Sequence, residues 1–292
     1  MEQPSHAGTC AGTDAPLVTA VIPVRDRAGM IGRAVASALA QTGVSLEVLV
    51  VDDGSTDGTA ATLAGIADPR LRVLAHARSR GVSAARNTGL AAARGAYFAL
   101  LDSDDAWLPE KTARQLECMR ARGLAISQTQ EIWMRGGRRV NPGRVHAKPD
   151  GFFFEQALAR CLVSPSTVMF TRQFWLEVGG FDETLPACED YDLWLRALLR
   201  HPVGLLDAPL AVRHGGRADQ LSAIYLGQDL FRIRSMCKLL ARDDITDWHR
   251  ECIKKELRRK ATRYVQGCLK RDKPEEAARI LELMRAAGAG QG

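Results

Sequence analysis

The sequence has no long apolar run and no ordered spacing of its cysteines. No segment approaches the roughly 20 consecutive apolar residues of a membrane-spanning helix, so we expect none. The first 15 residues are polar or small and contain no apolar core, so we expect a flexible arm there and not a signal peptide. The seven cysteines form no CxxC pair and no cluster with histidine, which indicates reduced thiols in a cytoplasmic protein.

The composition is otherwise that of an ordinary globular protein. The 292 residues are 46% hydrophobic and 25% charged, enough for one large α/β domain or for a domain with a tail. The net charge of +6 is concentrated in residues 250–271, which hold nine lysines and arginines against two glutamates. This segment is either a solvated helix face or a surface for an anionic membrane. We expect no nucleic acid partner.

Carboxylates follow a buried strand at residues 96–101. Asp102, Asp104 and Asp105 come directly after this short apolar run. Open α/β sheets bind ligands at the carboxyl ends of their strands, and hard cations such as Mg²⁺ or Mn²⁺ prefer carboxylate oxygens. The pattern indicates a metal holding a phosphorylated ligand. The alternative is an acidic turn before the helix that begins at Pro109.

A second acidic strand end supports a layered α/β fold. A strand at 46–51 runs into Asp52 and Asp53, after a first strand at 17–22 that we expect Pro23 to end. Helices are expected at 30–41, at 59–66 with Asp57 as N-cap, and from Ser83, also an N-cap, to 93. With a short strand at 71–74, this alternation predicts one doubly wound, mostly parallel sheet.

The second half of the chain has a less regular pattern. We expect helices at 109–122, 152–162 and 191–199, strands at 125–134, 167–170, 205–206 and 210–212, and a loop at 141–151. From residue 222 onward the apolar spacing is helical. We therefore expect an arm at 1–15, a main domain at 16–220 and a helical C-terminal region at 221–292. The main domain divides into a nucleotide-binding half at 16–105 and an acceptor half at 106–220.

Six segments together carry a family resemblance. They are VIPV at 21–24, VVDDGSTDGT at 50–59, GVSAARNTG at 81–89, LDSDD at 101–105, GGFDE at 179–183 and EDYDLWLR at 189–196. In this order and spacing, over residues 16–216, the chain resembles the family 2 glycosyltransferases, which have the nucleotide-sugar-binding A-type fold. The tail beyond residue 222 lies outside the resemblance.

The resemblance implies a nucleotide-sugar site in the first half. It places Asp53 against the base or ribose of the nucleotide and Arg86 near the diphosphate, where a guanidinium suits phosphate geometry. An acid capping the next turn and a solvated arginine are the respective alternatives. Pro23, Val24 and Arg25 fall in the same site. The family usually has an aromatic residue and then asparagine after the segment at 21–24, so Arg25 leaves the base open, with a UDP-sugar favoured.

The resemblance also implies a divalent cation, Mn²⁺ or Mg²⁺. Asp104 corresponds to the direct ligand, and Asp102 contacts the ribose or reaches the metal through water, with Ser103 between them in the nucleotide-sugar site. Asp105 caps or orients. His214 lies where family members often place a metal- or phosphate-binding histidine; a surface histidine is the alternative.

The acidic pair Glu189 and Asp190 corresponds to the family's catalytic position. An inverting transfer needs one carboxylate to take the proton of the acceptor hydroxyl. We assign this role to Asp190, with Glu189 as the alternative. A purely structural explanation is that both acids stabilise the positive end of a helix.

The sequence thus predicts an inverting, metal-dependent glycosyltransferase of cell-surface glycan or glycoconjugate synthesis. Its acceptor is a saccharide, a lipid-linked molecule or a protein, selected by residues 135–180 and the tail. Peripheral contact with the cytoplasmic face of the inner membrane is a further expectation. One alternative is an inactive nucleotide-sugar-binding or scaffolding relative. A sugar nucleotidyltransferase fits less well, because residues 23–29 hold only one glycine for cradling a triphosphate.

Overall fold

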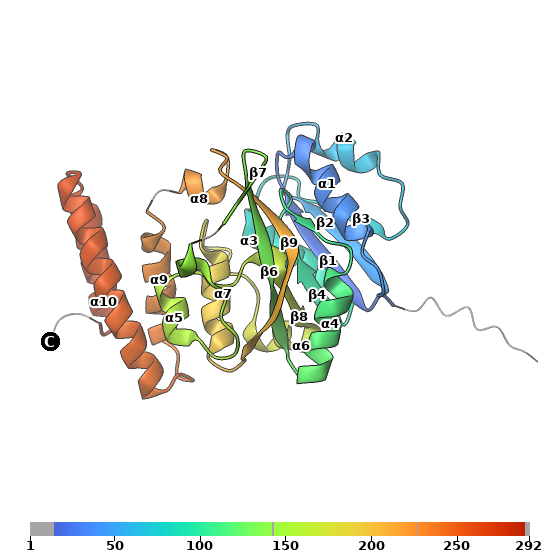
Figure 1. The fold of residues 1–292 in the computed structure, drawn as a ribbon. Coiled ribbons are helices and arrows are strands. Elements are labelled where there is room, and N and C mark those ends of the chain that lie inside the picture. The colour runs from blue at the N-terminus through green and yellow to red at the C-terminus, as the bar shows by residue number, and fades with distance from the viewer. Residues whose placement is uncertain (1–14, 142, 226, 290–292) are drawn as a thin grey trace, which may run out of the picture.

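The computed structural model describes residues 15–141, 143–225 and 227–289, and the arm predicted at 1–15 lies outside them except for Ala15. One curled sheet forms the centre of the molecule (Figure 1), with the strand order β3-β2-β1-β4-β8-β6-β9-β5 and β7 paired to β6. Helices cover both faces of this sheet. The predicted α/β class with a single doubly wound sheet and C-terminal helices is confirmed.

The first half of the sheet is parallel. Its strands are β1 (Val18–Val24), β2 (Leu46–Asp52), β3 (Leu71–Ala75) and β4 (Tyr97–Leu100). The prediction that Pro23 ends the first strand is wrong, since Pro23 pairs with Val51 inside β1. Pairing to β4 stops at Val21, so no neighbour on that side needs the N–H that proline lacks.

The second half of the sheet mixes both directions. It contains β5 (Ala106–Trp107), β6 (Ile126–Arg135), β7 (Arg138–Val140), β8 (Val168–Thr171) and β9 (Val203–Gly215). β8 is antiparallel to β4 and β6, whereas β6 and β9 are parallel. The two short strands predicted at 205–206 and 210–212 are one strand, β9. A bulge opposite Gln130 accommodates Pro209 and keeps both parts on β6.

The helices form two layers. They are α1 (Ala28–Leu39), α2 (Thr59–Ala64), α3 (Val82–Ala92), α4 (Lys111–Arg122), α5 (Phe154–Ala159), α6 (Arg172–Val178), α7 (Glu189–Leu198), α8 (Leu221–Ile224), α9 (Asp229–Leu240), α10 (Asp247–Lys270) and α11 (Pro274–Ala286). Short 3₁₀ turns lie at Arg144–His146 and Pro165–Thr167. Side chains of α1, α2 and α4 pack on one face of the sheet. The other face carries α3, α6 and α7, with α5 and α9–α11 in the same apolar cluster.

Neither predicted N-cap residue is the N-cap in the structure. The N-cap of α2 is Gly58 and not Asp57 as predicted, although the Asp57 carboxylate, one residue earlier, accepts the N–H of Thr59 at 2.8 Å. Ser83 does not cap α3, because the helix already begins at Val82 and the Ser83 hydroxyl is buried inside its first turn. Gly81, with φ at +94°, makes the turn into α3.

The C-terminal helices share the core of the sheet. Ile253, Leu257 and Ala261 of α10 are buried in the same cluster as Trp194 of α7, so the predicted apolar stripe is confirmed. In Figure 1, α9 and α10 lie on the far side of α7 from β1 and β2. Within the described part of the chain, no helix has both the length and the apolarity to cross a membrane.

Glu47 ties the parallel strands together from inside the molecule. Its side chain accepts hydrogen bonds from the hydroxyl of Thr19 at 2.7 Å, the backbone N–H of Arg94 at 2.6 Å and the guanidinium of Arg72 at 3.0 Å. Burial by itself would raise the pKa of Glu47. These donors outweigh burial and hold the pKa below its ordinary value of 4.5.

We predict that Glu47→Gln lowers the free energy of unfolding at pH 7 by about 1–3 kcal/mol, because charged acceptor contacts in the core are lost. A lowered pKa in the folded state stabilises the protein above the ordinary pKa. The deficit of the variant should therefore shrink as the pH falls below 4.5. Urea unfolding across this pH range measures both effects. The exposed Glu117→Gln is the control and should stay within about 0.5 kcal/mol of the wild type; an equal deficit at every pH would contradict the prediction.

Candidate active site

A cavity of about 1000 Å³ opens at the carboxyl ends of the parallel strands. It brings together nearly every site residue predicted from the sequence. These are Pro23, Val24, Arg25, Asp53, Arg86, Asp102, Ser103, Asp104, Glu189 and Asp190. His214 is not among its lining residues. The cavity is therefore the candidate active site, with the acids after β2 and β4 on one side and the start of α7 on the other.

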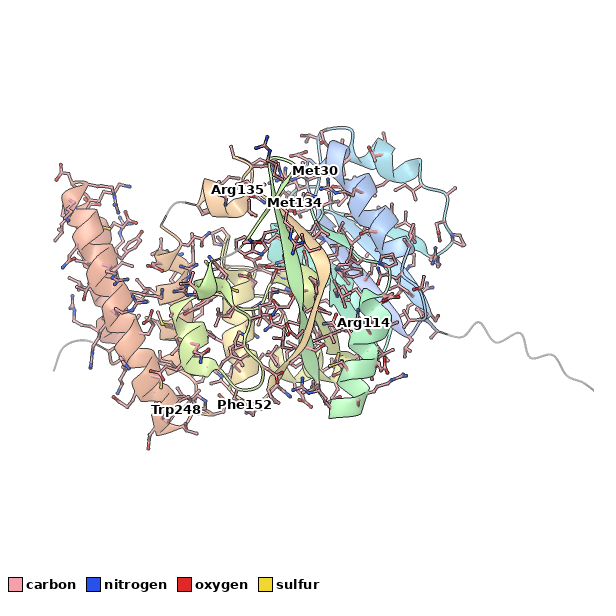
Figure 2. The ribbon with its side chains drawn as sticks, viewed as in Figure 1. Met30, Arg114, Met134, Arg135, Phe152 and Trp248 are labelled. Carbon is pink, nitrogen blue, oxygen red and sulfur yellow. The ribbon has the colours of Figure 1, made fainter. Side chains whose placement is uncertain are left out.

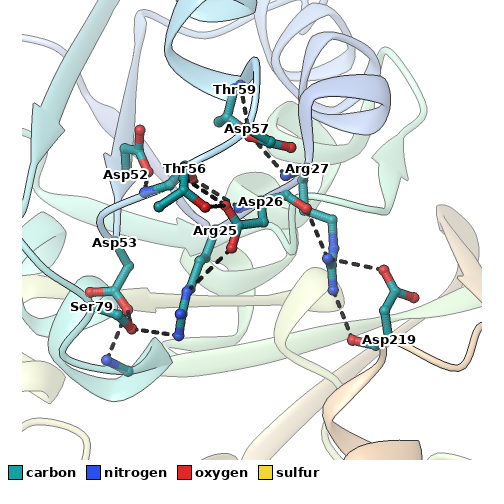
Figure 3. Close-up of polar contacts among 12 residues, drawn as sticks. Arg25, Asp26, Arg27, Asp52, Asp53, Thr56, Asp57, Thr59, Ser79 and Asp219 are labelled. Atoms are coloured by element: carbon teal, nitrogen blue, oxygen red, sulfur yellow. Dashed lines mark hydrogen bonds and ion pairs between the residues drawn. The ribbon is translucent and has the colours of Figure 1, made fainter.

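Asp53 organises the loop between β3 and α3. Its buried carboxylate accepts hydrogen bonds from the Ser79 hydroxyl at 2.7 Å and the backbone N–H groups of Arg80 and Gly81, both at 2.8 Å. The His76 ring lies 2.7 Å from the same carboxylate. Burial would raise the pKa of Asp53, but these contacts lower it. Figure 3 shows Asp53 beside Ser79. Asp53 thus shapes the loop under the cavity, and its direct contact with a base stays a prediction.

The residues after Val24 join three segments of the chain (Figure 3). Arg25 donates to the Ser79 hydroxyl at 2.8 Å. Asp26 has a left-handed backbone, with φ at 49°, and its carboxylate accepts the N–H of Thr56 at 2.7 Å. Arg27 forms an ion pair with Asp219 at 3.0 Å. These polar contacts fix the edge of the cavity at the position where the family usually has an aromatic residue and this chain has Arg25.

Arg86 bridges the two sides of the cavity. Its guanidinium is buried, and it donates to Asp102 at 2.7 Å and to Glu189 at 2.5 Å. The ring of Phe181 covers it, with the centroid 5.1 Å away. The alternative of a solvated arginine is therefore wrong. The predicted diphosphate contact stays a prediction, because both terminal nitrogens of the guanidinium already donate hydrogen bonds to carboxylates.

The two acids at the start of α7 differ in their surroundings. Burial raises the pKa of Glu189 to about 7, opposed by the charge of Arg86. Asp190 is half-buried, and it forms no ion pair with any residue that the structure describes. The thiol of Cys161 lies 3.4 Å from its carboxylate. Asp190 thus lines the cavity with a carboxylate that accepts only uncharged donors among the described residues, the thiol and the backbone N–H of Tyr191 at 2.7 Å, while Glu189 is held by Arg86.

Asp104 is paired with a cation of the chain itself. The guanidinium of Arg217 donates to its carboxylate at 2.5 Å, and the Gln220 amide donates to the same oxygen at 3.2 Å. Both donors lie in the segment 215–220 that follows β9. The contact between this segment and Asp104 was not predicted from the sequence. The doublet Gly215-Gly216, with φ at +89° in Gly216, was the available signal for a sharp turn.

The residues after β4 fit a hard cation whose coordination is completed by the phosphates of a bound substrate. Among residues 15–141, 143–225 and 227–289, no three His, Cys, Asp or Glu side chains converge into a preformed metal cluster. Mg²⁺ is commonly held by one or two carboxylates together with substrate phosphates, which is the donor set that Asp102 and Asp104 offer. The ligand role of His214 stays a prediction.

Asp105 has a structural position. One of its oxygens accepts the Ser166 hydroxyl at 2.6 Å and the other accepts the backbone N–H of His214 at 2.9 Å. Burial raises its pKa well above the ordinary value. Its contacts fix β9 and the turn at Pro165–Thr167 relative to the end of β4, in keeping with the orienting role expected for it.

The far wall of the cavity comes from segments that the resemblance left unassigned. Lys148 lies in the loop before α5, Arg213 lies in β9, and Arg259 and Arg263 lie in α10. The C-terminal helices therefore line the same cavity as Asp102 and Asp104.

The sequence and the fold were compared with known proteins. Residues 19–174, more than half of the chain, match the family described as Glycosyl transferase family 2. The succinoglycan biosynthesis protein ExoO of Rhizobium meliloti is 49% identical over 112 residues, which cover 38% of this chain and 32% of that relative. The chain spans 27% to 32% of the length of three curated relatives that it matches, ExoO among them.

Two solved structures share the fold. TarS 1–349 of S. aureus in complex with UDP-GlcNAc aligns with a TM-score of 0.73 at 19% identity, over 92% of this chain and 80% of that one. The mannosyltransferase PcManGT of Pyrobaculum calidifontis, in complex with GDP-Man and Mn²⁺, aligns with a TM-score of 0.61 at 19% identity, over 94% of this chain and 76% of that one. With the family match, the chain belongs to glycosyl transferase family 2 and has the A-type fold.

Proposed function

We propose that the protein transfers one sugar from a nucleoside diphosphate sugar to an acceptor hydroxyl, with inversion at the anomeric carbon. The observation that carries this proposal is a single cavity in which Arg86 joins Asp102, on the donor side, to Glu189, on the acceptor side. The buried guanidinium holds the two acidic segments at a fixed separation. A donor on Asp102 and Asp104 then presents its sugar to Asp190.

A UDP-sugar is the favoured donor. TarS was solved with UDP-GlcNAc and PcManGT with GDP-Man, so proteins of this fold hold nucleotide sugars of either base. The preference for uridine comes from the sequence resemblance. The contacts of Asp53 with the loop at 76–81 shape the floor on which a base would lie.

Asp190 is the proposed catalytic base. The acceptor oxygen attacks the anomeric carbon, its proton passes to the Asp190 carboxylate, and the bond to the diphosphate oxygen breaks. Glu189 cannot serve as readily, because its carboxylate is buried and held by Arg86. Its role is to fix the start of α7, so that Asp190 points into the cavity.

Asp104, supported by Asp102, is the proposed position for Mn²⁺ or Mg²⁺. When bound, the cation stabilises negative charge on the leaving diphosphate as a Lewis acid. In the structure Arg217 balances the charge of Asp104, so Arg217 has to leave this carboxylate before a cation can be held there. Arg217 lies in the segment next to Gly216, which gives it a point about which to move.

The acceptor belongs, in this proposal, to a cell-surface glycan or glycoconjugate. ExoO is named as a succinoglycan biosynthesis protein, and another matching relative is the hyaluronan synthase of Pasteurella multocida. Both names concern the synthesis of a polysaccharide. These names support a polysaccharide-related pathway for this protein; work at the cytoplasmic side of the membrane is a further part of the proposal.

Contact with an anionic membrane is a further part of the proposal. Lys254, Lys255 and Arg258 of α10 point away from the apolar core and leave its basic face accessible. Phe152 and Trp248 are 65% and 56% exposed, and Figure 2 shows both at the same end of the molecule. Exposed aromatic rings beside basic side chains are typical of surfaces that lie in a membrane interface.

We predict that Asp190→Asn lowers kcat by about 10²- to 10⁴-fold, the usual contribution of a general base. Nucleotide affinity should stay unchanged, because Asp190 does not contact the donor-side loops. Nucleoside diphosphate release from a panel of nucleotide sugars, with simple glycosides as acceptors, measures the rate. The exposed Asp243→Asn is the control and should behave as the wild type. Full turnover by Asp190→Asn, together with loss of turnover in Glu189→Gln, would identify Glu189 as the catalytic base. Nucleotide binding without turnover by any protein would point to a missing acceptor, and no nucleotide binding at all would favour the scaffolding relative.

We predict that Arg217→Ala binds Mn²⁺ about two- to fivefold more tightly in the absence of nucleotide, as expected for loss of a competing ion pair of roughly 0.4–1 kcal/mol. Asp104→Ala should abolish this binding. Calorimetric titration with MnCl₂ tests both variants without any need for activity. Arg70→Ala, which breaks a comparable ion pair with Asp68, is the control. An unchanged Mn²⁺ affinity in Arg217→Ala would contradict the competition.

We predict that the protein sediments with vesicles of phosphatidylcholine and phosphatidylglycerol, but not with phosphatidylcholine alone, and that salt reverses this binding. Each of Lys254→Ala, Lys255→Ala and Arg258→Ala should weaken it roughly fivefold, the equivalent of about 1 kcal/mol per basic residue. Arg114→Ala is the control, since Figure 2 shows Arg114 on α4, far from Trp248. Binding that ignores lipid charge would refute the contact.

A further inference from the structure

Cations outnumber carboxylates on the wall of the cavity beyond Asp190, which we call the acceptor-side wall. Its cations come from the loop before α5, the end of α5, β9, α9 and α10. They are Lys148, Arg160, Arg213, Arg232, Arg259, Lys260 and Arg263. The carboxylates that pair with them are Glu131, Asp229 and Glu256. Seven positive charges thus face three negative ones.

Near β9, one carboxylate forms ion pairs with two cations. Glu131 lies 3.5 Å from the ammonium of Lys148 and 3.8 Å from the guanidinium of Arg213. Burial lowers the pKa of Lys148 to about 8, opposed by Glu131. Arg213 stacks over the ring of Trp133 at 5.0 Å. Glu131 is thus the one carboxylate within ion-pair distance of these two cations among the described residues. The other acids that act on Arg213, which are Asp105, Asp102 and Asp190, lie across the cavity.

A similar excess exists where α9 meets α10. Arg232 and Lys260 share Asp229 at 3.0 and 3.1 Å, while Lys260 and Arg259 share Glu256 at 3.4 and 2.5 Å. Three cations therefore divide two carboxylates. The Nε of Arg232 is buried and has no hydrogen-bond partner in the described part of the chain.

Two arginines of the wall have no carboxylate of their own. Arg160 donates to the carbonyl of Val145 at 3.0 Å. Arg263 is exposed and contacts no acidic side chain among the described residues. Adjacent unbalanced cations repel one another, which disfavours the folded state unless an anion compensates them. A neutral sugar would not supply that compensation.

We propose that the acceptor carries a phosphate or diphosphate group, and that the acceptor-side wall binds it. This inference rests on the proposed transferase function and adds the chemical class of the acceptor. Guanidinium groups match phosphate oxygens in geometry and charge. With the phosphate on Arg259 and Arg263, the rest of the acceptor extends toward Asp190. Such a group belongs either to a lipid-linked diphosphate or to a phosphorylated glycan.

The test removes charge from the wall while leaving the fold intact. The double variant Arg259→Ala/Arg263→Ala changes two accessible side chains one helical turn apart. The matched control, Lys270→Ala/Arg271→Ala, removes the same charge from the C-terminal end of the same helix, but neither residue lines the cavity. Calorimetric titration uses inorganic pyrophosphate, geranyl diphosphate, glucose 1-phosphate and neutral methyl glucoside as probes. A nucleoside diphosphate with Mg²⁺ is present at saturation, so that the donor side is filled.

We expect the double variant to bind the anionic probes at least about tenfold more weakly than the wild type, as for lost charged hydrogen bonds. The control should change by less than about twofold, and all three proteins should bind the nucleotide equally. Preference for geranyl diphosphate would identify a lipid-linked acceptor, and preference for glucose 1-phosphate a phosphorylated glycan. Equal binding of anionic probes by the wild type and double variant, or none by the wild type, would overturn the inference. Failure of every protein to bind nucleotide would instead count against the proposed function.

Discussion

The geometry of the cavity depends on one buried guanidinium. Arg86 is withdrawn from water and is compensated by Asp102 at 2.7 Å and Glu189 at 2.5 Å. A buried arginine needs both partners, because removal of either leaves charge that the interior cannot solvate. The residues therefore fix the end of β4 against the start of α7, which are 16 and 103 positions away from Arg86 along the chain. The proposed donor and acceptor halves of the cavity meet through this contact.

Adjacent acidic residues of the cavity have different contacts. Each carboxylate fixed by a buried contact has a neighbour for which we propose a chemical role. Glu189 is bound to Arg86, and its neighbour Asp190 faces the cavity; Asp105 is bound to Ser166 and the N–H of His214, and its neighbour Asp104 accepts hydrogen bonds from the segment 215–220. Adjacent acids in this sequence are thus not redundant copies. One member of each pair holds the backbone, and the other reaches the ligand space.

The parts predicted well from the sequence are local. A strand of the parallel half is an apolar run that ends in a polar residue, so Asp53 and Asp102 were placed at the sheet edge by pattern alone. The mixed half was less accessible, because β9 reads as two strands until the bulge opposite Gln130 is known. The contacts of Arg86 and Arg217 were also hidden, since the partners of a charged side chain far away in sequence leave no periodic signal. The sequence shows that such a side chain is charged, but its ion-pair partner is known only from the fold.

The C-terminal helices follow from the same reasoning. The apolar stripe of α10 was visible in the sequence, and it buries Ile253 and Leu257 in the cluster that contains α7. Burying that stripe fixes the rotation of the helix about its axis. Arg259 and Arg263 are consequently turned into the cavity and Arg258 out of it. The sequence left two explanations for the basic excess of residues 250–271, a solvated helix face and a surface for an anionic partner. In the structure these basic residues lie on two different faces of α10. Because of the helical periodicity, basic residues that are close in the sequence lie on different faces of α10, and only one of these faces lines the candidate active site.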